Sequence, residues 1–314
     1  MSRALGINAK MALAFEATYG TAPVGGYKAM PFVSTTLGAE QALIPDDLIG
    51  TGRDPEAPSR DVLNAGGDVV VPVDLRNFGQ WLKLLLGAPA TTAATDVYTH
   101  VFESGAASLP SAAIEIGHPE VPSFAMNKGV KANTLAIRMQ RSGLVQATIG
   151  LIAQAEAAPT GASAAGAPSE AAVLRFNQFQ GSVSRGGVAM GNVTSADFTF
   201  SNNLETVDVI RNDGLIAGAD AGKAAFNANL TVRFDTLDLF NQAIAGTPSA
   251  MEFGFTISPD EKLIFTVPTV YLPRPKRSIS GPSGVQATFA VQGAKPAPGE
   301  PMFIATLVND VAAY

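Results

Sequence analysis

Residues 142–148 read Ser-Gly-Leu-Val-Gln-Ala-Thr, and residues 283–288 read Ser-Gly-Val-Gln-Ala-Thr, one residue shorter. Upstream, Ala65-Gly66 and Ala221-Gly222 each precede an alternating strand-like run, a helical pattern and a Gly-x-Pro stop. This shared order of loop, strand, helix and strand indicates that the chain contains one structural unit twice.

The spacing of the two copies shows where they differ. Gly87 and Gly246, which end the helical patterns, are 159 positions apart (246 − 87), whereas Val145 and Val285 are 140 apart (285 − 145). The first copy therefore contains 19 more residues (159 − 140) between its helix and its final strand. We interpret this excess as a longer loop or an added hairpin within one domain fold.

Composition limits the class of protein. A chain of 314 residues with 46% hydrophobic and 15% charged residues is long enough for two domains with packed cores. Its 31 Gly and 21 Pro, placed between short apolar runs, indicate many turns and a strand-rich chain. Without cysteine it has no disulfides or thiolate metal sites. The net charge of −6 and the lack of any basic cluster larger than Arg274–Arg277 argue against sequence-specific DNA binding.

Two helices are predicted among the strands. Residues 77–86 place Phe78, Trp81, Leu82 and Leu85 at helical spacing, and residues 236–245 repeat the pattern with Leu237 and Phe240. We expect these apolar stripes to pack each helix on its own sheet rather than to bind a ligand.

The predicted domain organisation has four parts. Residues 1–29 form an irregular N-terminal arm, residues 30–153 the first domain and residues 172–314 the second. Between them, residues 154–171 are rich in Ala, Gly, Pro and Ser. This stretch is either a linker between the copies or a surface loop within the assembly.

Two charged segments are predicted to be long exposed loops, Ile44–Gly67 and Leu204–Gly222. Both are too polar for core strands, and the first is too proline-rich for a helix. Their carboxylates lack the spaced acidic pattern of a calcium loop, so we interpret them as solvated charges. The candidate contact residues are Asp46, Asp47, Arg53, Asp54 and Arg60 in the first loop and Asp208, Arg211 and Asp213 in the second.

No catalytic, cofactor or metal site is predicted. His100 and His118 have no partners at a recognisable spacing, and we interpret them as a strand-surface and a turn histidine. Residues 218–224 are one residue short of a phosphate-binding loop, and Ala224 replaces the hydroxyl that would hold Mg²⁺. The sequence therefore favours a protein that is not an enzyme.

Several short stretches resemble one family. They are Glu16–Pro23, Tyr98–Phe102, Leu109–Ile116, Gly129–Ile137 and Gly143–Thr148. In this order, and over nearly the whole chain, they resemble the major tail tube proteins of long non-contractile-tailed (siphovirus-like) bacteriophages and prophages.

The resemblance implies a mainly β fold with two tandem tail-tube-type β-sandwich or half-barrel domains, each with one flanking α-helix. It also implies stacked rings around a channel for DNA passage, in which the two charged loops reach the adjacent ring. Because rings of this family commonly contain six single domains, two domains per chain predict a trimeric, pseudo-hexameric ring. A hexameric ring of one larger domain is the alternative.

The implied partners are other copies of the chain, the tape measure protein, the tail terminator and distal tail proteins, and DNA that passes without sequence-specific binding. The implied location is the virion tail, after assembly in the host cytoplasm, with no membrane contact. The alternative function is a virion decoration or receptor-binding module.

Overall fold

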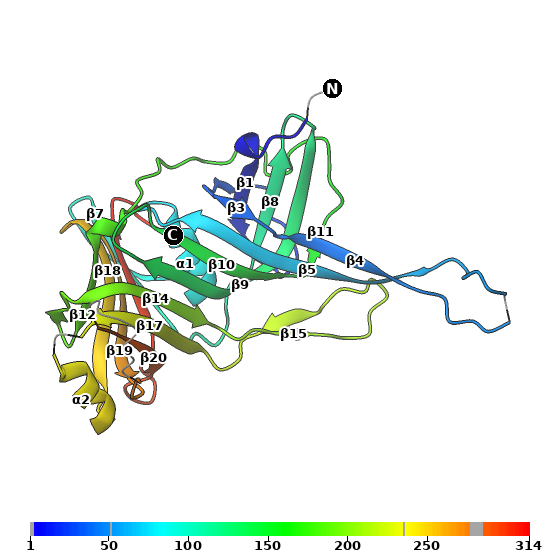
Figure 1. The fold of residues 1–314 in the computed structure, drawn as a ribbon. Helices are drawn as coiled ribbons and strands as arrows, with labels where there is room; N and C mark the ends of the chain where they lie inside the picture. The colour runs from blue at the N-terminus through cyan, green and yellow to red at the C-terminus, as the bar shows by residue number, and fades with distance from the viewer. Residues whose placement is uncertain (1–2, 51, 235, 277–284) are drawn as a thin grey trace.

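The computed structural model describes residues 3–50, 52–234, 236–276 and 285–314 and is dominated by antiparallel strands, which confirms the mainly β prediction (Figure 1). The helices are α1 (Phe78–Leu86) and α2 (Asp238–Ala245), with short 3-10 turns η1 (Gly6–Asn8) and η2 (Gln178–Gln180). The strands of the first half are β1 (Lys10–Phe15), β2 (Lys28–Ala29), β3 (Ser34–Thr35), β4 (Gly38–Ile44), β5 (Ser59–Pro72), β6 (Ala90–Ala94), β7 (Val97–Glu103), β8 (Ala112–His118), β9 (Ser123–Met139), β10 (Gln146–Ala153) and β11 (Ala155–Glu156). Those of the second half are β12 (Gly181–Arg185), β13 (Val188–Ala189), β14 (Val193–Ser201), β15 (Glu205–Val207), β16 (Gly218–Asp220), β17 (Ala225–Arg233), β18 (Ser249–Ser258), β19 (Glu261–Tyr271), β20 (Gln286–Ala294) and β21 (Ile304–Asn309).

One sheet runs through both halves of the chain. Its strands lie in the order β4, β5, β10, the second half of β9, β14, β17 and β20, and we call it the shared sheet. The two halves meet where β9 pairs with β14, from Met139 opposite Ala196 to Thr134 opposite Ser201. Ladder hydrogen bonds therefore continue from one half into the other at this β9–β14 junction.

The same strand pairings recur in the two halves. In the first half β1 pairs with β8, β8 with β9, β9 with β10, β10 with β5, and β5 with β4. In the second half β12 pairs with β18, β18 with β19, β19 with β20, β20 with β17, and β17 with β14. Each helix follows the matching strand, α1 after β5 and α2 after β17.

The repeated sequence stretches occupy matching places in these ladders. Ala147 lies opposite Val71, and Ala287 lies opposite Val232. These opposite pairs place the two copies 161 positions apart (232 − 71) in the sequence. This spacing is close to the 159 positions between the two helix ends, and it differs from the 156 positions between Ala65 and Ala221 (221 − 65). The first turn of the repeat, Ser142-Gly143, follows β9, whereas Ser283-Gly284 lies outside the described residues.

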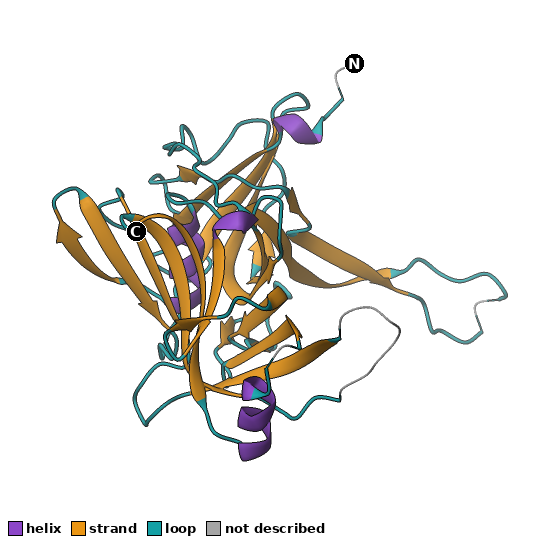
Figure 2. Cartoon of the chain, turned by 60° about the vertical axis from the view of Figure 1, so that its left-hand side comes forward, coloured by secondary structure: helices purple, strands orange, loops and turns teal. Residues whose placement is uncertain are grey.

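The hairpin of β6 and β7 lies between α1 and β8, where the first copy has its 19 extra residues (159 − 140), and has no counterpart after α2. Its strand β7 pairs with β21, from Tyr98 opposite Asn309 to Glu103 opposite Ile304. The added hairpin of the first half thus extends the second sheet of the other half, formed by β12, β18, β19 and β21 (Figure 2).

Helix α1 is almost wholly buried, as its apolar spacing predicts. Phe78 and Trp81 belong to the hydrophobic core, and Gly87 ends the helix with a φ of 102° that favours glycine. Helix α2 is also confirmed but packs less deeply. Phe240 is buried, whereas Leu237, predicted to pack on the sheet, is half exposed because it lies at the N-cap before the helix begins.

A single cluster of buried side chains extends across the β9–β14 junction. In the second half it is built from aromatic rings packed in tilted and stacked pairs. Phe198 lies 5.1 Å from both Phe253 and Phe265, and Phe303 lies 4.9 Å from Phe200, between ring centroids. Such pairs add roughly 0.5–1.5 kcal/mol each beyond the area that they bury.

Two segments predicted to be irregular are ordered against the first half. Strand β1 lies inside the predicted N-terminal arm, and its residues Met11–Ala14 are buried between β8 and β2. Within residues 154–171, Ala164 and Ala165 donate backbone hydrogen bonds to the buried Glu115. This stretch is thus an ordered surface segment held by the first half.

Candidate assembly surfaces

The shared sheet has one buried face and one open face. Along β17, Phe226, Ala228, Leu230 and Val232 are buried, whereas the alternate residues are exposed or half-buried, as a strand covered on one side requires. Cross-strand register extends the exposed set across the sheet. This open face is lined by Glu40 on β4, Asn64, Gly66, Asp68 and Val70 on β5, Gln146, Thr148 and Ile152 on β10, Lys131, Thr134, Ala136 and Arg138 on β9, Ser195, Asp197, Thr199 and Ser201 on β14, Asn227, Asn229, Thr231 and Arg233 on β17, and Gln286, Thr288, Ala290 and Gln292 on β20.

Charges on the open face are few and balanced. Asp197 lies opposite Arg138 across the β9–β14 junction and accepts a hydrogen bond of 2.9 Å from Asn229 Nδ2. Over the described residues, three acidic side chains (Glu40, Asp68, Asp197) and three basic ones (Lys131, Arg138, Arg233) share this face. The remainder is mostly hydroxyl, amide and small side chains, so the open face is polar without net charge.

The shared sheet ends in two edges. Strand β4 pairs through its backbone with β5 alone, and β20 pairs over Gln286–Val291 with β17 alone, among the residues that the structure describes. An edge strand presents unpaired N–H and C=O groups that can continue a ladder into another chain. The two edges are therefore candidate contacts between copies.

The first predicted loop, Ile44–Gly67, is wrong in its second half. Residues 59–67 belong to β5, which pairs with β4 to form a long hairpin that projects from the body (Figure 1). We call the described residues among 40–64 the first arm, and residues 45–50 and 52–58 its tip. The strands of the arm are held by backbone pairing, since neither of their faces is buried.

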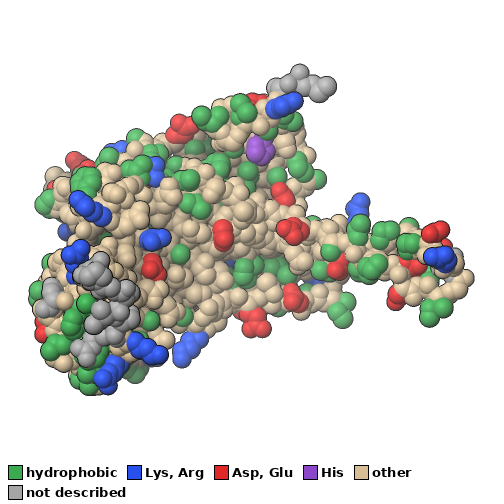
Figure 3. Space-filling model, in the orientation of Figure 1, with side chains coloured by type: hydrophobic (Ala, Val, Ile, Leu, Met, Phe, Trp, Pro, Cys, Tyr) green, Lys and Arg blue, Asp and Glu red, His purple; other side chains and the backbone are tan. Residues whose placement is uncertain are grey.

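The tip of the first arm combines acidic and apolar side chains (Figure 3). Asp46 organises it, because its carboxylate accepts hydrogen bonds from the backbone N–H of Leu48 at 3.1 Å and of Glu56 at 3.3 Å. The side chain of Ile49 is 99% exposed, and Leu48 is also exposed. Of the other predicted contact residues, Asp47, Arg53 and Asp54 lie in the tip, whereas Arg60 lies on β5 opposite Leu43.

The second predicted loop, Leu204–Gly222, is also a hairpin, because β15 and β16 pair within it. We call residues 205–220 the second arm. Arg211 and Asp213 form an exposed ion pair of 2.6 Å near its tip, and the hydrogen bond from Arg211 lowers the pKa of Asp213. Asp208 and the fully exposed Ile210 lie beside them.

The second arm is fastened to the first half of the chain. Lys131 Nζ donates to Ala219 O at 2.6 Å, and Gln154 Nε2 donates to Ile216 O at 3.1 Å. Both arms leave the same end of the shared sheet, and a Cβ added to Gly214 would lie 3.7 Å from Val62 Cα. The structure thus places the two sets of predicted contact residues at one end of the molecule, but on separate arms (Figure 1).

Glu16, a residue that sequence reasoning did not select, joins three segments. Its carboxylate accepts hydrogen bonds from Gly20 N at 2.9 Å, Gly129 N at 2.8 Å and Ser111 Oγ at 2.7 Å. Burial raises the pKa of the neighbouring Tyr19 to about 12. The stretch Glu16–Pro23 therefore has a structural role, in which the carboxylate of Glu16 holds Gly20, Ser111 and Gly129 together.

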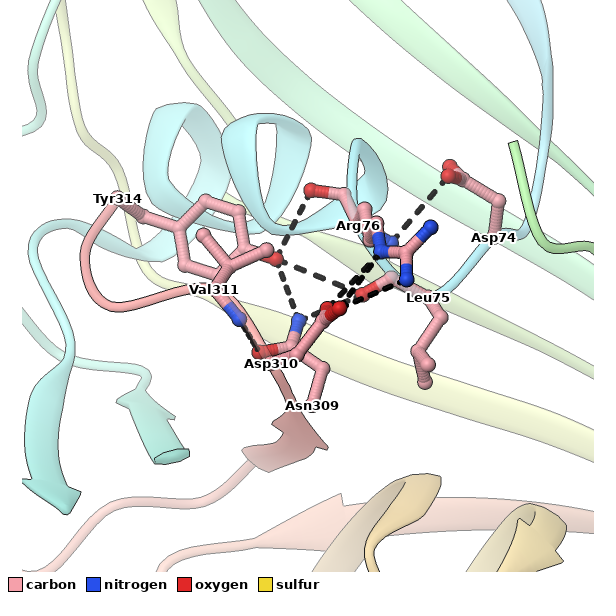
Figure 4. Close-up of polar contacts among 7 residues, drawn as sticks. All are labelled: Asp74, Leu75, Arg76, Asn309, Asp310, Val311 and Tyr314. Carbon is pink, nitrogen blue, oxygen red and sulfur yellow. Dashed lines mark hydrogen bonds and ion pairs between the residues drawn. The ribbon is translucent and has the colours of Figure 1, made fainter. Parts of the chain in front are cut away.

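The C-terminal residues fasten β21 to the start of α1 (Figure 4). Tyr314 donates its hydroxyl to Arg76 O at 2.9 Å and accepts a hydrogen bond of 2.6 Å from Asn309 Nδ2. Arg76 forms an ion pair of 2.7 Å with Asp310. Asp74, whose pKa is raised by burial, accepts the backbone N–H of Asn77 at 3.0 Å just before the helix.

The prediction of a surface position for His100 is wrong. Its side chain is buried, and its ring nitrogens lie 2.8 Å from Thr91 Oγ1 and 2.8 Å from Val311 O. The ring also packs edge-on against Tyr314 at 4.7 Å. His118 is the last residue of β8, immediately before a turn.

Metal-ligand clusters and membrane-spanning helices are both missing from the described residues. No group of three or more His, Cys, Asp or Glu side chains there could hold a metal ion. In the same part of the chain, no helix is long and apolar enough to cross a membrane.

Comparison with known families matches residues 6–293 to the family described as phage tail tube protein. The chain belongs to this family of structural virion proteins, because the match covers most of its length. It is a subunit of a bacteriophage tail tube. Comparison with curated proteins gives no match.

Proposed function

We propose that the chain forms stacked rings around a central channel through which DNA leaves the capsid during ejection. The observation that carries this proposal is the shared sheet, which has one polar face without net charge and an edge strand at each end. A curved sheet that pairs its edges with neighbouring copies closes into a barrel and leaves no edge exposed.

We propose that the ring contains three chains, each a fusion of two tail-tube-like units. The recurring pairings support the fusion, and the β9–β14 junction is the intrachain equivalent of a contact between subunits. In the equivalent contact of a trimer, the β4 edge of one copy would meet the end of the next copy's sheet at β20 and β19, because β4 corresponds to β14 and β19 to β9. A hexameric ring of one larger domain remains the alternative.

The open face of the shared sheet is the proposed channel wall. Its opposite face is covered by the hydrophobic core. Tight DNA binding requires clustered Lys and Arg that neutralise phosphates, and the open face offers balanced charges among Thr, Ser, Asn and Gln. Such a wall lets a polyanion pass without holding it.

The first and second arms are the proposed contacts between successive rings. Both leave one end of the shared sheet, so identical rings would stack with one polarity. A contact between unlike surfaces that does not close on itself extends into a filament. The stack would end at a tail terminator and at distal tail proteins, and a tape measure protein would set its length.

We propose that the tube assembles in the host cytoplasm and becomes part of a siphovirus-like tail. We assign the chain no catalytic step.

Electron microscopy of the purified protein tests the proposal. We expect tubes of stacked rings with three-fold symmetry and a six-fold appearance at low resolution. A protein that stays monomeric at all concentrations and is missing from tail particles would refute it. Attachment to capsids or host cells without tube formation would support the alternative, a decoration or receptor-binding module.

A charge added to the open face tests the channel wall. Thr199→Lys should leave tube assembly intact and slow DNA ejection in a salt-dependent way, because each ring would gain a set of inward-facing cations. Thr92→Lys on the exposed strand β6 is the matched control and should behave as wild type. Equal ejection rates in both variants would place the channel elsewhere.

A further inference from the structure

A pocket lies at the end of the shared sheet opposite to the arms. It has a volume of about 450 Å³ between the end of β9, η2 and the start of β14. Its apolar lining includes Met139, Phe179, Met190 and Val193, and its charged lining residue is Arg141. We call it the end pocket.

Strand register fixes its position relative to the arms. At the β9–β14 junction, Met139 and Ala196 pair at the pocket end, and Thr134 and Ser201 pair at the other end. The second arm begins just after Ser201, and the first arm continues from Gly66, which pairs with Ile152. An arm therefore leaves one end of each molecule and the end pocket opens at the other.

Phe179 is held in an exposed position by its neighbours. Its side chain is 76% exposed, although Gln178 beside it is buried. Gln178 Nε2 donates to Arg138 O at 2.9 Å, and Gln178 Oε1 accepts from Gln140 N at 3.0 Å. The η2 turn is thus fixed to the end of β9, and the ring of Phe179 is presented at the pocket without rearrangement.

The tip of the first arm complements the end pocket in charge. Over residues 45–50 and 52–58, Asp46, Asp47, Asp54 and Glu56 outnumber Arg53 and give a net charge of −3 (1 − 4). The lining residues of the end pocket include Arg141 and no acidic side chain. Lys and Arg side chains also gather on the body away from the arm, whereas acidic side chains lie along it (Figure 3).

The tip and the pocket also match in apolar character. Leu48 and Ile49 are exposed at the tip, and Phe179 is exposed at the pocket, so each surface leaves large apolar side chains in water. The tip of the second arm is a poorer match, since its Arg211 is already paired with Asp213 and the arm is fastened to its own body.

We propose that the tip of the first arm docks in the end pocket of a second copy of this chain in the next ring. Leu48 and Ile49 contact Phe179 and its apolar neighbours, while the carboxylates of the tip face Arg141. The inference rests on the proposed function and adds to it the receiving site of the arm.

Thiol crosslinking tests the contact directly, because the chain has no cysteine of its own. A double variant, Ile49→Cys with Phe179→Cys, is treated with a short bifunctional maleimide after assembly. We expect chains linked into long ladders. The control, Ile49→Cys with Val24→Cys, uses another fully exposed apolar position and should give no ladder. Ladders in the control alone, or tubes that crosslink in neither variant, would overturn the docking site.

Substitutions at the pocket separate docking from ring formation. Phe179→Ala and Arg141→Glu change exposed side chains, so we expect folded rings that fail to stack. Asp47→Arg combined with Arg141→Glu restores the opposite charges and should recover tubes. Normal stacking by Phe179→Ala and Arg141→Glu would exclude the pocket while leaving the tube function standing. A wild-type protein that forms no rings would instead contradict the proposed function itself.

Discussion

Asp197 of β14 lies directly opposite Arg138 of β9, where the two halves of the chain join in one sheet. One residue further along the ladder, Phe198 lies opposite Ile137 on the buried face. The junction thus has a charged pair on its open side and an apolar pair on its core side. Because a buried apolar contact and facing exposed charges act on stability by different mechanisms, we expect their contributions to differ in size.

Phe198→Ala should destabilise the protein by about 3–5 kcal/mol, because it leaves a cavity among stacked rings. Asp197→Ala should change the free energy of unfolding by no more than about 1 kcal/mol, since exposed cross-strand charge pairs contribute little. Urea denaturation of both variants measures the difference. Equal losses would mean that the charged pair, and not the core, joins the halves.

Gly79→Ala should destabilise the protein, although alanine favours helices by up to about 1 kcal/mol over glycine. A Cβ at this position would lie 2.3 Å from the ring of Tyr314 and displace it. Such overpacking costs about 1–3 kcal/mol. In a Tyr314→Ala background the same substitution should become neutral or stabilising, and a double-mutant cycle by thermal denaturation measures the coupling. Additive effects would show that the ring does not pack on α1.

Glu16→Gln should destabilise the protein by about 1–3 kcal/mol. The carboxylate accepts hydrogen bonds from two backbone N–H groups, and the amide NH₂ of glutamine would place a donor against one of them. The matched control is Glu40→Gln on the exposed strand β4, which should be neutral. Denaturant midpoints of the two variants test this. A neutral Glu16→Gln would mean that Gly20 and Gly129 do not depend on the carboxylate.

Trypsin should cut unassembled protein first after Arg53 in the tip of the first arm, since this residue is exposed and lies outside the strands. Mass spectrometry of early fragments identifies the sites. In tubes the cut after Arg53 should slow, and unchanged cleavage would show that the tip stays free.

Stability should fall as pH decreases below about 6.5, the ordinary histidine pKa. Burial lowers the pKa of His100, so the folded state resists protonation while the unfolded state does not. The contribution is complete above the unfolded pKa and is lost as pH falls toward the folded value. His100→Gln should flatten this part of the profile, as thermal melts between pH 5 and pH 8 would show. A profile that His100→Gln leaves unchanged would contradict this.

Sequence patterns predict the elements whose apolar residues recur at a regular spacing. Phe78 and Trp81 mark α1 in this way, although every residue of the helix except Lys83 is buried. Along β17 the alternation of buried residues, such as Phe226 and Leu230, with exposed ones is the strand counterpart of that spacing. The resemblance carried by Glu16–Pro23 and related stretches predicts the family that the match over residues 6–293 shows.

Sequence patterns did not predict the strands whose two faces are equally exposed or equally buried. The strands of the first arm are exposed on both faces, so no alternation separates them from a loop. The prediction misses strand β1 for the opposite reason, because Met11–Ala14 are buried on both faces. His100 alternates like a surface residue, but Tyr314 and Val311, which are distant in sequence, contact its ring. The end pocket combines η2 with strands β9 and β14, and no local pattern predicts that meeting.

The β9–β14 junction also bears on the kinetics of assembly. If three chains close the proposed ring, three of its six joints between units are already made when each chain folds. Ring formation then requires three molecules to meet rather than six, so its dependence on protein concentration is correspondingly less steep. Fusing two units thus lowers the concentration at which rings nucleate and fixes the ratio of the two kinds of unit at one to one.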